Sequence, residues 1–138
     1  MLEKYYKYKI DYNDYVVLVK AGNFYECFGN DALVLNKLLN YKIKLFKNTL
    51  KVGFPVNGIE SVKDILKIHS IYYMVINDDK PILTNFDYKN PYNNYIFNTE
   101  LIYYNLMRIE KIYKSLTENI TSSNINNILN NIENVISE

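Results

Sequence analysis

The chain has 138 residues, 49% of them apolar, and a formal net charge of +1 at pH 7, a length that fits one domain whose core needs neither disulfides nor metals. Cys27 is the one cysteine, so an internal disulfide is excluded and nothing points to an oxidising compartment. The N-terminus lacks the apolar core of a signal peptide and no apolar run approaches the roughly 20 residues of a membrane helix, so we expect a cytoplasmic protein without a membrane partner.

Helix and strand patterns alternate along the first two thirds of the chain. In chain order, they predict a helix at 2–10, a strand at 15–19, a helix at 30–39, strands at 41–45 and 50–54, a helix at 61–69, a strand at 71–76 and a short strand at 81–86. Asn30 or Asp31 is expected to cap the second helix and Ser61 the third, whose buried stripe includes His69. Because the elements interleave without the regular repeat of a doubly wound fold, the predicted fold class is α+β (mixed α/β), a central mixed β-sheet flanked by helices.

The end of the chain shows helix patterns alone, unlike the alternating helix and strand patterns before it. Apolar side chains recur with four-three spacing at 99–116 and again at 125–136, which predicts a hairpin of two amphipathic helices. The second helix is rich in asparagine, a poor helix former, so it needs tertiary or quaternary contacts to persist. We therefore expect a sheet domain at 1–98, a helical part at 99–138, and a homodimer held by residues 99–136.

The stretch after the first predicted strand carries the pattern that points to a chemistry. It reads Lys20-Ala21-Gly22-Asn23-Phe24-Tyr25-Glu26, and in extended backbone Phe24 and Glu26 face the same way. A ring and a hydrogen-bond acceptor presented together can read a nucleic-acid base. The stretch resembles the mismatch-recognition domain (domain I) of MutS, whose signature is Gly-Asp-Phe-Tyr-Glu after a hydrophobic strand. Further landmarks in the family's order, such as Gly53-Phe54-Pro55, extend the resemblance over residues 1 to about 79.

The resemblance implies a module that binds mismatched or kinked duplex DNA without catalysis and without a cofactor. Phe24 matches the family's wedge, which stacks on a mispaired base, and Glu26 matches the carboxylate that hydrogen-bonds that base. Asn23 stands where the family has aspartate, and Val56-Asn57 where it commonly has Tyr-His. The predicted DNA-binding residues are Phe24, Glu26, Lys20, Asn23, Lys47, Lys51 and Asn57.

Charge and the absence of a nucleotide motif limit this function. A net charge of +1 predicts weak DNA binding, because phosphate neutralisation supplies most non-specific affinity. The lysines at positions 42, 44, 47 and 51 are either phosphate contacts or an ordinary solvated face. The sequence contains no Gly-rich phosphate loop ending in Gly-Lys-Ser/Thr, so we expect an ATP-independent protein and a separate repair ATPase as a partner.

The residues themselves also allow other interpretations of the site and of the function. Phe24, Tyr25 and Phe28 can be core aromatics of a sheet, and the chain can be an interaction module of a repair or mobile-element system that kept the fold and lost DNA binding. Asp78-Asp79-Lys80 has the Asp-x-Lys spacing of many metal-dependent nucleases, although a tripeptide in a polar turn is weak evidence.

Overall fold

The structure is a computed structural model that describes residues 2–78 and 80–137. The chain forms two compact units, residues 1–103 and residues 104–138. In chain order the elements are α1 (Leu2–Lys9), β1 (Val16–Ala21), β2 (Phe24–Phe28), α2 (Asn30–Leu39), β3 (Lys44–Phe46), β4 (Thr49–Pro55), the 3-10 turn η1 (Val56–Gly58), α3 (Ile59–Ile68), β5 (Tyr73–Asn77), β6 (Lys80–Thr84), the 3-10 turn η2 (Tyr92–Tyr95), α4 (Thr99–Glu118) and α5 (Ile125–Ile136).

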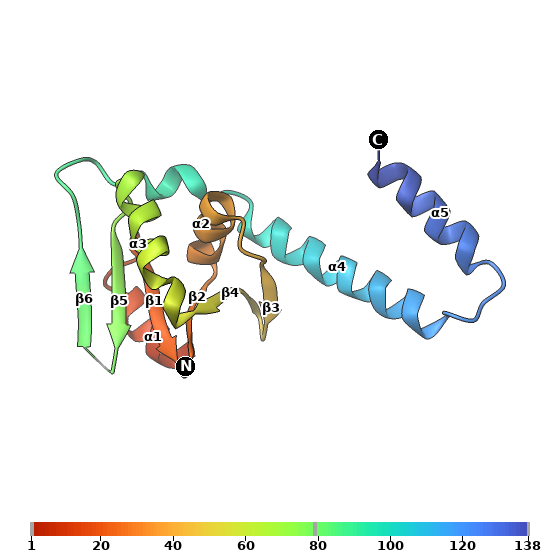
Figure 1. Ribbon diagram of the computed structural model, residues 1–138, viewed down its shortest axis with the longest axis horizontal. Helices are drawn as coiled ribbons and strands as arrows, with labels where there is room; N and C mark the ends of the chain where they lie inside the picture. The colour runs from red at the N-terminus through yellow and green to blue at the C-terminus, as the bar shows by residue number, and fades with distance from the viewer. Residues whose placement is uncertain (1, 79, 138) are drawn as a thin grey trace. The chain divides into compact units, whose positions relative to one another are not determined.

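The first unit is built on a six-stranded sheet in the order β3-β4-β2-β1-β5-β6. β1 pairs with β5 in parallel and every other described neighbour pair is antiparallel, so the sheet is mixed. Helices lie on both faces, with α2 and α3 together on one of them (Figure 1). The predicted fold class is therefore confirmed.

Alternation along β2 divides its side chains between the two faces of the sheet. Tyr25 and Cys27 are buried on one face, while Phe24, Glu26 and Phe28 point to the other. The ring of Phe28 packs edge-on against Tyr5 of α1, with 5.0 Å between ring centroids. α1 thus covers the Phe28 end of β2 and leaves Phe24 exposed at the other end.

Asp31 does not cap α2 but is the centre of a buried polar network. The helix begins after Gly29, and the fully buried Asp31 carboxylate accepts hydrogen bonds from Tyr5, Lys9, the Val17 amide and Tyr92. Burial, and then the carboxylate itself, raises the pKa of both tyrosines above the ordinary range, so each remains a hydroxyl donor. The network ties α1, β1 and η2 to the start of α2.

Two expectations about α3 are wrong, one at each end of the helix. The helix begins at Ile59 after Gly58 because η1 leads directly into it, so Ser61 lies inside the first turn and is no cap. The helix ends at Ile68, and His69 follows it with an exposed side chain whose ring lies 6.2 Å from that of Tyr95. His69 is therefore a surface residue and lies off the buried stripe.

The second unit contains most of α4, from Tyr104 onward, and all of α5, which confirms both predicted helices. Neither helix has a fully buried residue among those the structure describes. Large apolar side chains stay exposed on both, including Ile109, Ile112, Tyr113, Val135 and Ile136. None of the helices in the described part of the chain is both long and apolar enough to cross a lipid bilayer.

Candidate nucleic-acid interface

A two-residue turn places the predicted site at the tip of the β1–β2 hairpin. Ala21 and Phe24 face each other across the strands, and Gly22 between them has a φ of 62°, which favours glycine at the first position of a type II′ turn. The carbonyl of Asn23 accepts a hydrogen bond from the Val56 amide at 2.9 Å. This bond holds η1, which carries the exposed Asn57, beside the turn.

Phe24 is an exposed aromatic residue at the start of a strand. Its side chain is 49% exposed, and its direct neighbours across the sheet are Ala21 and Pro55, which are too small to cover a phenyl ring. Tyr25 behaves differently, because it is buried and stacks on Phe54 with 5.8 Å between ring centroids. The interpretation as core aromatics therefore fits Tyr25 and Phe28 but does not fit Phe24.

Glu26 is held by a cation on the neighbouring strand. Its Oε2 lies 2.8 Å from Nζ of Lys51, and the two side chains are 16% and 23% exposed, respectively. The same ammonium group lies 4.5 Å from the centre of the Phe46 ring. The carboxylate is thus charge-compensated within the sheet.

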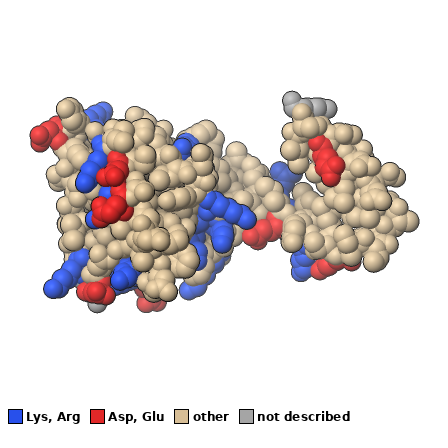
Figure 2. All heavy atoms as spheres, in the orientation of Figure 1, with Lys and Arg blue, Asp and Glu red and all other residues tan. Residues whose placement is uncertain are grey.

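A groove of about 410 Å³ joins these side chains. It is lined by Phe24, Glu26, Tyr41, Lys42, Lys44, Lys51 and Gly53. Lysine side chains gather on this side of the first unit, where β3 and β4 lie (Figure 2). An exposed ring, a carboxylate and exposed lysines around one hollow are suited to a base together with its flanking phosphates.

The structure brings some of the predicted residues together and separates others. Phe24, Glu26 and Lys51 line the groove. Lys20 pairs with Tyr25 across the strands, so its exposed side chain points to the opposite face from Phe24. Lys47 lies in the β3–β4 turn with a φ of 54° and does not line the groove.

Tyr41 is a groove residue that the sequence analysis missed. It was expected in a strand, yet β3 begins only at Lys44, and the Tyr41 ring stacks on Phe54 with 5.6 Å between centroids. The sequence carries no signal for this contact, because it depends on how an irregular segment crosses the sheet.

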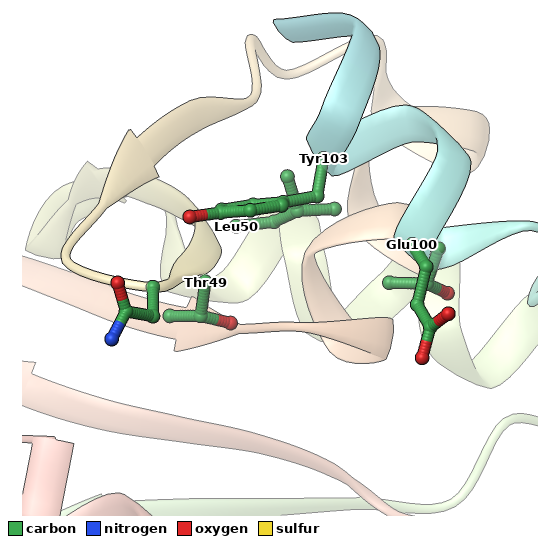
Figure 3. A pocket seen from close by; sticks show the side chains of 6 residues that line it. Thr49, Leu50, Glu100 and Tyr103 are labelled. Carbon is green, nitrogen blue, oxygen red and sulfur yellow. The ribbon is translucent and has the colours of Figure 1, made fainter. Parts of the chain in front are cut away.

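A second hollow lies elsewhere in the first unit. It measures about 160 Å³ and is lined by Asn48, Thr49, Leu50, Thr99, Glu100 and Tyr103. Figure 3 shows the Tyr103 ring, from the start of α4, together with Leu50 and Thr49 of β4. Its one charged lining residue is Glu100, so it is unsuited to phosphate.

Other chemistry has little support from the described residues. Within residues 2–78 and 80–137, no group of three or more His, Cys, Asp or Glu side chains is placed to hold a metal ion. Asp79, on which the nuclease alternative depends, lies outside the described residues. Cys27 is fully buried, and burial raises the pKa of its thiol well above the ordinary value, as expected for a packing residue.

The mixed sheet with helices on both faces, and a phenyl ring and a carboxylate on one face of its second strand, is the architecture expected from the resemblance seen in the sequence. The family described as MutS domain I matches residues 1–125, and the chain belongs to this family. The match extends past residue 79, where the resemblance noted in the sequence ends, and runs through β6, η2 and α4.

Curated relatives share the first part of this match. The DNA mismatch repair protein MutS of Thermus aquaticus is 33% identical over 70 residues, which are 48% of this chain and 9% of that protein. MutS of Thermotoga petrophila is 31% identical over 61 residues, 44% of this chain and 8% of that protein. The chain therefore spans less than a tenth of the length of these relatives.

Proposed function

We propose that the chain is a DNA mismatch-recognition module that binds mismatched or kinked duplex through Phe24 and Glu26, without an ATPase activity of its own. The observation that carries the proposal is the exposed Phe24 ring beside the Glu26 carboxylate, on one face of β2, in a member of the MutS domain I family. An apolar wedge between base steps costs about a few kcal/mol of unstacking, and least where pairing is already broken. Insertion of the Phe24 ring therefore costs least at a mismatch, where base pairing is already broken, and this difference in cost selects the mismatch.

Phosphate contacts come from the rim of the same groove. Lys42 and Lys44 are exposed and line the groove together with Phe24, so their charges can meet the DNA backbone on either side of a kink. Asn23 and Asn57 flank the tip and offer neutral polar contacts, while Lys20 and Lys47 remain predicted contacts outside the groove. Two groove lysines supply little electrostatic affinity, so specificity depends on the wedge.

The partners follow from what these residues lack. The 138 residues hold no nucleotide-binding loop, so a repair ATPase is a proposed partner, and the cytoplasm is the proposed location.

Residues 99–136 are the proposed homodimer element, because exposed isoleucines and leucines of α4 and α5 need a cover. α5 carries no lysine or arginine, which makes another protein surface a better partner for it than DNA.

The alternative function is a protein-interaction module that kept the fold and lost DNA binding. This alternative holds if a net charge of +1, with Lys51 engaged by Glu26, leaves too few cations to hold a duplex. In both functions the first unit folds in the same way, so only binding separates them.

Fluorescence anisotropy with labelled duplexes that differ by one mismatched pair tests the proposal. Wild type is expected to bind the mismatched duplex more tightly, and Phe24→Ala is expected to lose this preference. Phe97→Ala is a matched control, because Phe97 is also an exposed phenylalanine, 64% exposed, and does not line the groove. Equal binding of both duplexes by wild type would refute mismatch recognition, and an unchanged preference in Phe24→Ala would refute the wedge.

A further inference from the structure

We propose, on the basis of the function above, that Lys51 determines mismatch specificity by neutralising and positioning Glu26, and that it does not bind a DNA phosphate. In the sequence, Lys51 belongs to a group of lysines that are either phosphate contacts or a solvated face. Its surroundings in the sheet differ from those of Lys42 and Lys44.

Two neighbours, Gly53 and Phe46, fix the Lys51–Glu26 pair. Gly53 is the residue directly opposite Glu26, and a Cβ added there would lie 3.8 Å from Cγ and 3.9 Å from Oε2 of Glu26. The Glu26 side chain therefore lies across Gly53, toward Lys51 on the same strand. Nζ of Lys51 lies 2.8 Å from Oε2 and 4.5 Å from the centre of the Phe46 ring, so the ammonium group is held from two sides.

Partial burial makes this pair hard to open. With 16% and 23% of the two side chains exposed, the charges attract each other through a medium less polar than bulk water. A phosphate that took Lys51 would leave a mostly covered carboxylate without its counter-charge, close to a second negative group. Lys42 and Lys44 are exposed and have no ion-pair partner among the described residues, so phosphates are expected to bind them instead.

The pair leaves Glu26 able to accept a hydrogen bond from a base. Nζ of Lys51 lies on the Oε2 side of the carboxylate, and within the described part of the chain Glu26 has no ion-pair partner other than Lys51. An oxygen held in one orientation gives a displaced base a preorganised acceptor, and its compensated charge does not repel the flanking phosphates. Lys51 therefore acts on specificity through Glu26, as a positioning residue.

A double-mutant cycle with salt titration tests the inference. The variants are Lys51→Met, which keeps an unbranched stem against Phe46 and removes the charge, Glu26→Gln, and the two combined. Lys44→Met is the matched control. For each variant the dissociation constants for matched and mismatched duplex are measured over a series of salt concentrations, with the melting temperature as a check of folding.

We expect Lys51→Met to lower the mismatch preference severalfold in the wild-type background and to leave it unchanged in the Glu26→Gln background. In the wild-type background, Lys44→Met should flatten the slope of log affinity against log salt by about 0.9, the effect of one lost phosphate contact, and Lys51→Met should leave the slope as it is. Lys51→Arg should keep the preference, because a guanidinium group can also pair with Glu26.

Two other results would overturn the inference. The first is an equal loss of affinity for both duplexes in Lys51→Met with a slope flattened as in Lys44→Met, which would make Lys51 a phosphate contact. The second is loss of the preference in a folded Lys51→Arg variant. In both cases wild type still prefers the mismatch, so the proposed function stands. If wild type has no preference, the proposed function fails and the inference fails with it.

Discussion

The substitution Tyr92→Phe tests the buried network around Asp31 by removing one hydroxyl group from it. The Tyr92 hydroxyl donates to Oδ1 of Asp31 at 2.5 Å, and its ring lies 4.8 Å from Nζ of Lys9. Phenylalanine keeps the ring and removes the hydroxyl. Because hydrogen bonds to charged groups contribute about 1.5–3 kcal/mol, we expect Tyr92→Phe to lower the free energy of unfolding at pH 7 by about 2 kcal/mol.

Alkaline pH should reduce this difference. Burial, and then the Asp31 carboxylate, raises the pKa of Tyr92 in the folded state, whereas in the unfolded state it is that of an ordinary tyrosine, about 10. The stabilisation is therefore complete below about pH 10 and is lost as the pH rises further, because the unfolded chain then releases a proton that the folded chain retains. With a slope of 1.36 kcal/mol per pH unit, wild type loses about 1.4 kcal/mol by pH 11 that Tyr92→Phe does not lose.

Urea unfolding followed by far-UV circular dichroism at pH 7 and pH 11 measures this change. The stability difference between wild type and Tyr92→Phe should shrink from about 2 to about 0.6 kcal/mol. Tyr88→Phe is the control, since Tyr88 is 72% exposed and loss of its hydroxyl should not change the free energy of unfolding at either pH. A difference that stays constant or grows at pH 11 would show that Tyr92 does not act as a buried donor.

Three further predictions concern the proposed interface and the end of the chain. Phe24→Ala should lower the free energy of unfolding by less than about 1 kcal/mol, because the ring is half exposed, and a larger loss in thermal melting would identify it as a core residue. DNA affinity should be micromolar or weaker, with a shallow salt slope to which the two groove contacts at Lys42 and Lys44 contribute about −1.8, and nanomolar binding by a monomer at physiological salt would contradict this. Light scattering over a range of concentrations should give a dimer mass. A monomer mass throughout would refute the dimer, and a dimer that persists without residues 99–136 would refute its location.

Periodicity in the sequence was enough for most of the fold. A period of two along β2 predicts that Phe24 and Glu26 share a face, and the structure places both on the groove. The same alternation also determines the face on which Lys20 lies. Once Gly22 and Asn23 form a two-residue turn, Ala21 must pair with Phe24 and Lys20 with Tyr25, which puts Lys20 on the other face.

Long-range polar contacts could not be predicted in this way. Asp31 looks like a helix cap because it is an aspartate directly before an apolar run, and its neighbours in sequence do not reveal another role. Its donors come from Tyr5, Lys9, Val17 and Tyr92, at sequence separations of up to 61 residues. The Lys51–Glu26 pair has the same origin, since it depends on the register of β2 and β4 and on the bare backbone at Gly53.

Low charge suits the proposed function better than a strongly basic surface would. A module that searches duplex DNA must compete against a large excess of matched sites, so the ratio of specific to non-specific affinity matters more than affinity itself. Each lysine that contacts phosphate strengthens binding to matched and mismatched duplex alike. Holding Lys51 against Glu26 removes one such contact and leaves Lys42 and Lys44 to supply the non-specific attraction. The stacking of Phe24, which depends on how weakly a base pair is held, then accounts for a larger share of the total binding energy.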